Sequence, residues 1–595
     1  MLNEHLKKQI IERLLPLVQT PGQYVGGEWN ALSKDHRAVK GTICLAFPDA
    51  YSIGMSHLGL QILYAVMNSR DWACERVFTP LADMENLLRE HGIPLYSLET
   101  FTPLNRFDVL GFSLQYDLCY ANVLTMLDLG GIPLTAEARA MEHPLVIAGG
   151  PCALNPEPMA RFFDLFIIGD GEEALPEVCD QWIFQKKTGA DRQSMLAEMA
   201  RRFPFVYVPR FYRPQFNTDG KTIAVRPVQK DFPECVQPAV VDLQSALLPT
   251  APVVPHVECV HERIAIEIMR GCPGKCRFCQ STTLKRPLRF RQVETIVQAA
   301  LETYRKTGYN EVSLLSLSTS DYPHFDKLVE RLQDAFATLY VGISLPSLRV
   351  NESLRLVGEL ISTFRHSSLT LAPEVALDDM REQIAKHITN EDLYAGCRKA
   401  FEKGFNRVKL YFMCGLPGER KIDLDGIIEM SQTIARLGKE VSGRFPTVVA
   451  NIANFVPKPQ TPYQWNAMQR REYFLDAHRY LRKCNRMRCV QLKCHDVESS
   501  LLEAALCRGD RRMGDAIELA WRRGARLDAW AERLNPGLWW QAMTDCSIDV
   551  DEIMHVPYPA CAPLPWDHIG IRQGRSYLER EHSESTKQLE RMVCH

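Results

Sequence analysis

The stretch Ile264-Ala-Ile-Glu-Ile-Met-Arg-Gly-Cys272-Pro-Gly-Lys-Cys276-Arg-Phe-Cys279-Gln280 decides the fold of this chain. It begins with an apolar run at residues 264–269 and passes directly into a loop in which Cys272, Cys276 and Cys279 have the spacing CxxxCxxC. Three thiolates on one loop can bind three irons of a [4Fe–4S] cluster and leave the fourth iron without a protein ligand. The sequence therefore predicts an iron–sulfur site directly after a buried strand.

Two other interpretations of these cysteines stay open: a structural zinc site, or three cysteines that share a loop by chance. Structural zinc sites usually combine two CxxC pairs, or a cysteine pair with a histidine pair. No second CxxC pair stands near the loop. The spacing therefore favours iron and sulfur over zinc.

Apolar runs after the loop alternate with segments of helical periodicity. This alternation is typical of parallel strands joined by crossover helices, and six strands suit a partial (β/α)₆ barrel with its chemistry at the strand C-termini. After residues 264–269, the expected strands are 311–316, 340–344, 367–371, 407–412 and 447–455. The expected helices are 291–308, 324–338, 351–362, 391–404 and 423–439.

A second alternation of strands and helices lies upstream, between about residues 41 and 190. Its apolar runs are 42–47, 109–114, 145–148 and 164–168, and turns at Asp49, Gly149-Gly150 and Gly169 follow several of them. Parallel sheets of this kind bind ligands in the crevice at the C-termini of their strands. No GxGxxG fingerprint follows the first run, which disfavours a dinucleotide.

We divide the chain into five parts on this pattern. Prolines crowd the segment between the two alternating regions, and the pattern after residue 470 is helical. The parts are an N-terminal helix and linker (1–40), an α/β domain (41–200), a proline-rich β connector (201–257), the barrel (258–470) and a helical C-terminal region (471–595).

The composition indicates where in the cell the protein resides and which classes of partner it is expected to have. The 595 residues carry 70 Lys plus Arg against 72 Asp plus Glu, so no global positive field would attract nucleic acid. No apolar stretch reaches the length that spans a bilayer, and the N-terminus lacks a signal peptide's apolar core. The 19 cysteines are an odd number in a chain without an export signal, which argues against a disulfide framework. We expect a cytoplasmic protein.

The cysteine loop resembles that of the radical S-adenosylmethionine (SAM) superfamily. There, CxxxCxxC follows the first barrel strand and an aromatic residue, here Phe278, precedes the last cysteine. The resemblance implies a [4Fe–4S] cluster whose open iron is chelated by SAM, and reductive cleavage of SAM to a 5′-deoxyadenosyl radical. It also implies a reducing partner such as flavodoxin or ferredoxin.

The blocks after the later barrel strands resemble the branch with methylthiotransferases and cobalamin-dependent radical enzymes. They include Leu371-Ala-Pro-Glu374 and Gly415-Leu-Pro-Gly-Glu419. The resemblance places SAM contacts at the strand ends, with Glu374 at the ribose or amino group and Gly415 beside adenine. The implied SAM-binding residues are Ser316, Ser344, Arg349, Glu374, Gly415 and Val456.

The upstream domain resembles the cobalamin-binding-like domain that precedes many radical SAM barrels. Asp49, Gly149, Gly150 and Gly169 match its turns and are the implied cobalamin contacts. The chain departs from the DxHxxG pattern that supplies a histidine to cobalt, because Tyr51 stands at that place. The expected fold is thus an N-terminal Rossmann-like, cobalamin-binding-like sheet, a radical SAM barrel and a helical C-terminal region.

The full-length layout resembles an uncharacterised family of cytoplasmic bacterial radical SAM proteins. We expect an enzyme that cleaves SAM and modifies an unknown substrate, with methyl transfer as one route. The alternatives are methylthio or sulfur insertion into RNA or protein, and a non-catalytic iron–sulfur protein that binds RNA or a partner. The basic region 482–526, rich in arginine and interrupted by Trp521, is the candidate RNA surface, and no membrane contact is expected.

Overall fold

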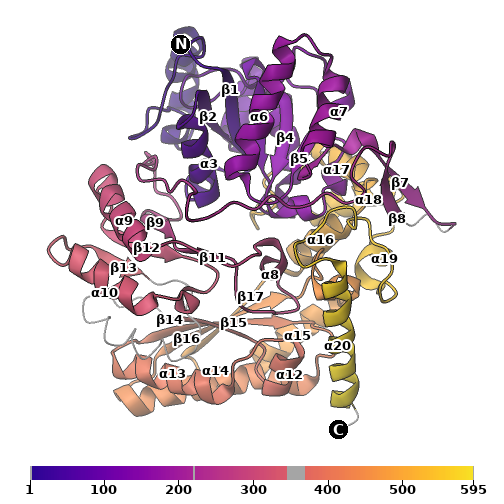
Figure 1. The fold of residues 1–595 in the computed structure, drawn as a ribbon. Coiled ribbons are helices and arrows are strands. Elements are labelled where there is room, and N and C mark those ends of the chain that lie inside the picture. The colour runs from indigo at the N-terminus through magenta and orange to yellow at the C-terminus, as the bar shows by residue number, and fades with distance from the viewer. Residues whose placement is uncertain (1–2, 219–221, 345–368, 594–595) are drawn as a thin grey trace.

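The computed structural model describes residues 3–218, 222–344 and 369–593. In Figure 1 an N-terminal α/β unit lies at the top and the barrel strands and their helices lie below it. The C-terminal helices run down one side and contact both parts. Within the described ranges, no helix is both long and apolar enough to cross a bilayer.

The N-terminal unit is built on a six-stranded sheet of order β2-β1-β3-β4-β5-β6. Strands β1 to β5 are parallel, and the two-residue β6 (Val206–Tyr207) runs antiparallel to β5. Every residue of β1 is buried, as expected for a sheet covered on both faces. The parallel strands are β1 (Gly41–Phe47), β2 (Trp72–Phe78), β3 (Val109–Ser113), β4 (Leu145–Gly149) and β5 (Leu165–Ile167).

Helices surround this sheet and connect its strands. The helix α3 (Leu58–Asn68) follows the turn after β1 and packs on β2, and α6 (Gly171–Lys187) follows β5. The other helices are α4 (Ala82–Glu90), α5 (Tyr120–Leu129) and α7 (Arg192–Arg202). A short hairpin of β7 (Tyr212–Phe216) and β8 (Thr222–Pro227) opens the proline-rich connector, which has little helix, as predicted.

The six predicted barrel strands are present and their paired neighbours are parallel. They form one sheet of order β13-β12-β9 and a second of order β14-β15-β16, to which β17 is added. The strands are β9 (Ile264–Glu267), β12 (Glu311–Leu315), β13 (Gly342–Ser344), β14 (Leu369–Glu374), β15 (Arg407–Cys414), β16 (Thr447–Asn454) and β17 (Val490–Cys494). The barrel helices are α9 (Val293–Thr307), α10 (Phe325–Phe336), α12 (Asp378–Gln383), α13 (Asn390–Glu402) and α14 (Lys421–Ser442). The helix predicted at 351–362 lies outside the described residues.

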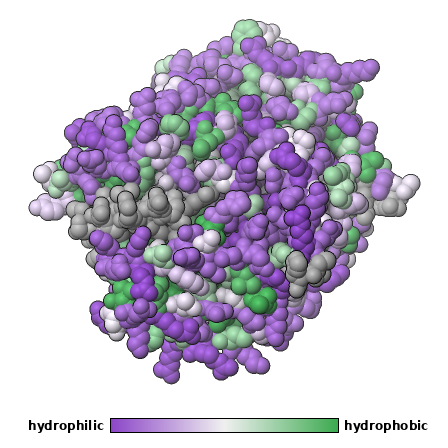
Figure 2. Space-filling model, turned by 60° about the horizontal axis from the view of Figure 1, so that its bottom comes forward, coloured by the Kyte–Doolittle hydropathy of each residue, from purple (hydrophilic) through white to green (hydrophobic). Residues whose placement is uncertain are grey.

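The C-terminal helices join the barrel to the N-terminal unit. The indole N–H of Trp521 donates to Thr125 Oγ1 at 3.0 Å, and the guanidinium of Arg526 pairs with Glu85 at 3.1 Å. The helices are α15 (Arg471–Cys484), α16 (Val497–Arg508), α17 (Met513–Arg522), α18 (Pro536–Asp545), α19 (Val550–His555) and α20 (Arg575–Val593). The face shown in Figure 2 is mainly hydrophilic, with apolar residues in small separate groups. The predicted boundaries at residues 200, 257 and 470 stay predictions.

Two strands that extend the main sheets, β2 and β17, were not predicted. Strand β2 pairs along its whole length with β1, and β17 pairs with β16, so the second barrel sheet continues into the region predicted to be helical. The predicted N-terminal helix is present but irregular: α1 (Glu4–Gln9) continues into one π-helical turn at Ile10–Leu14 and a 3₁₀ turn at Leu15–Leu17.

Candidate active site

The cysteine loop is closed at its base by a two-residue antiparallel pair. Strand β10 (Met269–Arg270) pairs with β11 (Arg289–Phe290), so residues 271–288 form one excursion from the barrel. Gly271 starts the loop with φ of 96°, and a Cβ there would lie 2.8 Å from the carbonyl oxygen of Lys285. This turn therefore requires glycine.

The loop is held against the rest of the protein by Arg277, which lies between the second and third cysteines. Its backbone N–H donates to Ile384 O at 3.0 Å, and its guanidinium donates to Gln383 O at 2.6 Å and to Gln588 Oε1 at 2.5 Å. Because Gln588 belongs to α20, the C-terminal helix helps to fix the cysteine loop.

The three cysteines fit a cluster site. Cys272 and Cys276 are buried, and Cys279 is half-buried. Burial raises the pKa of the Cys279 thiol, but backbone N–H groups of Ser281 and Thr282 act in the opposite direction. Such amides are the donors that stabilise thiolate sulfur in iron–sulfur sites.

Across residues 3–218, 222–344 and 369–593, no three His, Cys, Asp or Glu side chains converge as a single metal ion would require. A cubane gives each cysteine its own iron, so its thiolates need no common point. The loop therefore fits a cluster better than it fits one zinc ion.

Glu374 stands at the end of β14, in a strained backbone conformation. Its φ is 67°, and the pairing of β14 with β15 shifts register between Leu371 and Glu374. Its carboxylate accepts from Lys386 Nζ at 2.8 Å, and its charge contributes to the raised pKa of Cys279. A non-glycine residue in this region costs about 1–3 kcal/mol and is common at functional sites. Glu374 thus lies close enough to the cysteine loop to serve a ligand there.

Gly415 is required by packing. Its φ is 85°, and a Cβ would lie 2.6 Å from the Phe474 ring. Its N–H donates to Glu419 Oε2 at 2.8 Å, and the same carboxylate oxygen accepts from the Tyr473 hydroxyl. Burial raises the pKa of Glu419 to about 7.

The remaining predicted SAM residues lie at other strand ends. Ser316 follows β12, where its hydroxyl contacts Thr319 Oγ1 at 3.0 Å. Ser344 ends β13, and Val456 is half-buried just after β16. Arg349 lies outside the described residues. Their role in SAM binding stays a prediction.

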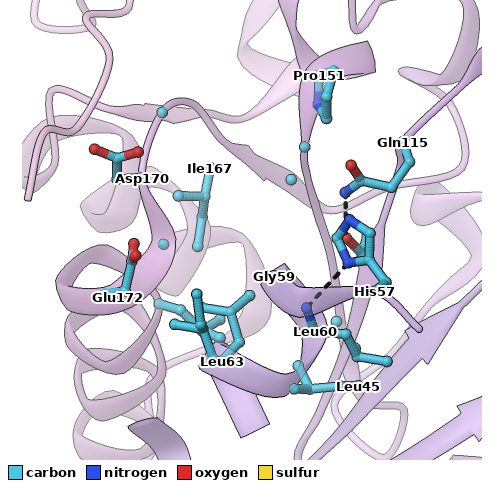
Figure 3. A pocket seen from close by; sticks show the side chains of 18 of the residues that line it. Leu45, His57, Gly59, Leu60, Leu63, Gln115, Pro151, Ile167, Asp170 and Glu172 are labelled. Carbon is cyan, nitrogen blue, oxygen red and sulfur yellow. Dashed lines mark hydrogen bonds between the residues drawn. The ribbon is translucent and has the colours of Figure 1, made fainter. Parts of the chain in front are cut away.

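A cavity of about 370 Å³ lies between the N-terminal sheet and the base of the cysteine loop. Its apolar lining comes from the sheet and from α3, and includes Leu45, Leu63 and Ile167 (Figure 3). Three of its lining residues, Glu267, Arg270 and Lys285, belong to β9, β10 and the cysteine loop. The carboxyl ends of the N-terminal strands therefore face the loop across this space. We refer to it as the interdomain cavity.

Ion pairs cross the interdomain cavity at one edge. The guanidinium of Arg270 donates to Asp170 Oδ1 at 2.9 Å, to Glu172 Oε1 at 2.5 Å and to Glu267 Oε2 at 2.8 Å. Asp170 also accepts from Arg289 Nη1 at 2.5 Å. These contacts fix β10 and β11, the two ends of the cysteine loop, to the start of α6.

Lys285 supplies a further cation to this cavity. Burial lowers its pKa, with the positive charge of Arg270 acting in the same direction, while Asp170 and Glu267 oppose them. We did not select Arg270 or Lys285 from the sequence. A charged residue directly before Gly271 was the available signal for Arg270, whereas Lys285 has no local signature.

His57 also lines the interdomain cavity, at the start of α3. Its Nδ1 accepts the N–H of Leu60 at 3.1 Å, and Gln115, whose amide N–H donates to Ser113 Oγ at 2.7 Å, lies beside the ring (Figure 3). Because Nδ1 is an acceptor, Nε2 carries the proton of the neutral ring. Burial lowers the pKa of His57 to about 4, so the ring is neutral near pH 7. Nδ1 is therefore engaged with the backbone of α3, and Nε2 carries the ring proton.

The predicted corrinoid contacts divide into two groups. Gly149, Gly150 and Gly169 line the interdomain cavity, whereas Asp49 does not. The Asp49 carboxylate accepts from Ala50 N at 2.6 Å and from Trp530 Nε1 at 2.9 Å. Tyr51 is buried, and its hydroxyl donates to Glu28 Oε1 at 3.0 Å, so it also lies away from the cavity lining.

The three predicted glycines that line the cavity are not all required by the backbone conformation. Gly150 and Gly169 have φ of 110° and 98°, and a Cβ at either would lie 2.5 Å or less from a backbone oxygen. Gly149 has room, since its Cβ would meet only Ile167 O, at 3.4 Å. An apolar cavity with glycine edges and one side of paired charges fits an amide-bearing planar cofactor such as a corrinoid. A complete corrinoid would extend out of a cavity of this size.

The arginines at 508–526 are engaged within the protein. Arg508 is buried and donates to three backbone carbonyls, and Arg511 pairs with Glu157 at 2.8 Å. Four others pair with carboxylates, namely Arg512 with Asp510, Arg522 with Glu518, Arg523 with Asp545 and Arg526 with Glu85. This half of the predicted RNA surface therefore has few cations left for phosphate.

Three proteins illustrate what the chain is similar to. An uncharacterized protein of Methanocaldococcus jannaschii is 25% identical over 483 residues, which cover 80% of this chain and 90% of that protein. The ribosomal protein uS12 methylthiotransferase RimO of Prochlorococcus marinus is 25% identical over 182 residues, 28% of this chain and 37% of RimO. The solved structure of the radical SAM methyltransferase TsrM from Kitasatospora setae overlaps with a TM-score of 0.48 at 13% identity, covering 71% of this chain and 74% of that one.

Two stretches match known families in the order of the fold. Residues 59–209, most of the N-terminal unit, match the family described as "Radical SAM proteins, N-terminal". Residues 266–430, which hold the cysteine loop and the barrel from β9 into α14, match the "Radical SAM superfamily". With the CxxxCxxC loop after the first barrel strand, these matches establish that the chain belongs to the radical SAM superfamily.

Proposed function

We propose that this radical SAM enzyme is a corrinoid-dependent methyltransferase that acts on a small molecule. The interdomain cavity is the observation that supports the proposal, because the glycine edge of the N-terminal sheet faces Arg270 and Lys285 at the cysteine loop across it. A methyl group passed between two cofactors requires them to be neighbours, and the Arg270 ion pairs hold the two sides together.

The chain's own residues would hold and orient the cofactors. Cys272, Cys276 and Cys279 would bind the cluster, and Glu374, held by Lys386, would accept from the ribose or amino group of SAM. Once bound, the cluster and SAM supply the radical chemistry of the superfamily and a corrinoid supplies a transferable methyl group. The apolar lining of the interdomain cavity would exclude water from this chemistry.

The proposed corrinoid would lack a protein ligand to cobalt. Nδ1 of His57 accepts from Leu60 and Nε2 carries the ring proton, and Tyr51 is directed to Glu28 rather than to the cavity. Lys285 would instead meet an anionic or carbonyl group at the edge of the cofactor. Gly149, Gly150 and Gly169, the predicted contacts that line the cavity, would allow the cofactor to approach the backbone closely.

We propose a flavodoxin or ferredoxin as reductant. A hollow of about 310 Å³ is formed by the cysteine loop and residues 572–577, and its lining includes Lys275, Arg286 and Arg572. Lys275 lies between two of the cluster cysteines and is exposed, as is Arg572. An acidic electron carrier would be attracted to these cations.

Two alternative functions, sulfur insertion and action on RNA, have less support from the structure. Sulfur insertion would call for a second cysteine group, but the candidates are scattered through the N-terminal unit: Cys44, Cys74, Cys119 and Cys179 are buried and Cys152 is half-buried. An RNA substrate would rest on the exposed cations of 482–493, which are Arg482, Lys483, Arg486, Arg488 and Lys493.

The test is corrinoid loading. The full-length protein is purified without oxygen from cells fed hydroxocobalamin, and its visible spectrum is recorded after the iron is removed. We expect stoichiometric corrinoid in the wild type and loss of corrinoid in Gly149→Phe, whose ring would enter the cavity without backbone strain. Gly537→Phe, on an exposed turn of α18, is the control. A wild type without corrinoid, alongside a corrinoid protein that loads fully, would refute the proposed methyl transfer.

A further inference from the structure

A second, smaller cavity adjoins the first and is not explained by either cofactor. It measures about 180 Å³ and shares Gln115 and Pro151 with the interdomain cavity. Gln280, which directly follows the last cluster cysteine, lines it and donates to Pro459 O at 3.1 Å. We refer to it as the side cavity. It lies where the N-terminal unit, the cysteine loop, the barrel and α16 meet.

A triad of charged residues lines the side cavity. The ammonium of Lys458 lies 2.9 Å from Asp117 Oδ2 and 2.7 Å from Glu503 Oε1. Burial would lower the pKa of Lys458, but the negative charges of Asp117 and Glu503 outweigh it and raise the pKa well above its ordinary value. Lys458 therefore stays cationic and is neutralised within the protein. The second carboxylate leaves the triad with a net negative charge.

Asn155 lines the side cavity, and its side chain carries a buried acceptor that has no donor among the described residues. The amide nitrogen of Asn155 donates to Cys507 O and to Gly509 O, both at 2.9 Å. Rotating the amide would place its oxygen against those two carbonyl oxygens, so its orientation is fixed. Its Oδ1 is buried and has no hydrogen-bond partner in the described part of the chain. An unmatched buried acceptor costs about 1–3 kcal/mol, which a donor from a ligand would recover.

We propose that the side cavity binds the protonated amine of the substrate. An ammonium group supplies both of the things the site lacks, a positive charge for the triad and N–H donors for Asn155 Oδ1. A carboxylate or phosphate would meet an excess of negative charge, and Lys458 is already paired with two carboxylates. The inference rests on the proposed function, and it narrows the substrate class to small primary amines.

The position of the side cavity relates the amine to the reacting groups. Gln280 places its rim next to Cys279, and Gln115 and Pro151 form the boundary with the interdomain cavity. A molecule anchored here by its amine would extend the rest of its frame toward the space between the cluster and the proposed corrinoid. The volume suits an amino-acid-sized molecule, or the amine end of a longer one, and is too small for a folded RNA or protein segment.

The test compares head groups on one frame. Phenethylamine, 2-phenylethanol and 3-phenylpropionate differ mainly in carrying an ammonium, a hydroxyl or a carboxylate, and ethylamine and agmatine vary the length of the amine. Binding to the anaerobic full-length protein is followed by saturation-transfer NMR. We expect at least one of the amines to bind and the alcohol and the acid not to bind. Binding of none of the amines, or equal binding of the amine and the acid, would overturn the proposal.

Glu503→Gln tests whether the triad provides the selectivity. Glu503 is partly exposed, so the variant should fold, and it removes one negative charge from the triad. Amine affinity should fall roughly tenfold, the loss of one charge pairing. Glu579→Gln is the matched control, since the Glu579 side chain is 33% exposed against 35% for Glu503 and also pairs with a cation, Arg575. Unchanged amine affinity in Glu503→Gln would overturn the proposal.

Iron and corrinoid contents are measured on the same samples. A protein that binds amines selectively but takes up no corrinoid would keep the amine site and refute the methyl transfer proposed above. A protein that loads corrinoid but binds no amine would refute the amine site alone.

Discussion

Arg270 and Asp170 join the two halves of the molecule, with Nη1 of the arginine 2.9 Å from Oδ1 of the aspartate. Both side chains are buried, although the residues stand a hundred positions apart in the chain. Asp170 also accepts from Arg289 and from the N–H of Val241. Removing one partner of such a group leaves the others buried without compensation.

We therefore expect Asp170→Asn to lower the free energy of unfolding by about 3 kcal/mol, the range for breaking a buried ion pair. Asp545→Asn, which breaks the exposed pair with Arg523, should cost much less, since exposed pairs are screened by solvent. Urea unfolding followed by tryptophan fluorescence measures both. Equal losses in the two variants would contradict the structural role of Asp170.

The cluster prediction concerns stoichiometry. Anaerobic reconstitution should give about four irons per chain, as one cubane requires. Replacing Cys272, Cys276 and Cys279 together by Ala should abolish the iron, whereas Cys397→Ala, in the buried face of α13, should keep it. Eight irons in the wild type, with four retained in the triple variant, would show a second cluster.

Glu374 is expected to serve SAM and not the cluster. Glu374→Gln keeps the shape of the side chain but removes the charge that pairs with Lys386. SAM affinity, measured by equilibrium dialysis, should fall roughly tenfold, as for one lost charge-assisted contact. Iron content should not change. Glu382→Gln, on the exposed side of α12, is the control, and equal SAM affinity in both variants would remove Glu374 from the site.

His57 should make stability depend on pH. Burial lowers the pKa of His57 from the ordinary 6.5 to about 4. Between these two pH values the unfolded chain binds a proton at His57 and the folded protein does not. The contribution of neutral His57 is complete above pH 6.5 and is lost as the pH falls toward 4.

His57→Asn should weaken the dependence of the melting temperature on pH between pH 6.5 and 4. His91→Asn, at an exposed position, should leave that dependence unchanged. Burial lowers the pKa of His478 in the same way, so part of the slope should remain in the variant. Parallel profiles for the wild type and His57→Asn would show that the imidazole stays accessible to protons.

The barrel and the cysteine loop could be predicted because their signals are local. Strand C-termini carry the cysteines, Glu374 and Gly415 within a few residues of an apolar run. Strand β2 was not predicted because Glu75 and Arg76 lie in its middle, and charged residues usually indicate an exposed segment. Both are buried, and their partners Glu28, Glu99 and Thr100 lie more than 20 residues away.

The cavities could not be predicted because they arise from packing between distant segments. Asp49 was chosen for its place after β1, but Trp530 from the C-terminal region binds its carboxylate. Lys285 and Lys458 lie in segments without a periodic pattern, and their surroundings come from the N-terminal unit and α16. Sequence patterns indicate which residues end a strand but not which remote side chain meets them.

The last prediction concerns the proposed reductant. Arg572 is exposed beside the hollow formed with the cysteine loop, so a change there alters the surface and not the cluster. Arg572→Glu should slow SAM cleavage driven by reduced flavodoxin by roughly tenfold at low salt, since an opposed charge lowers the association rate. Cleavage driven by dithionite should be unchanged, because that small reductant needs no docking surface. Arg470→Glu, on an exposed arginine paired with Asp551, is the matched control. Raising the ionic strength should bring the wild type down toward the variant, as screening requires. Equal flavodoxin-driven rates in Arg572→Glu and the control would place the docking surface elsewhere.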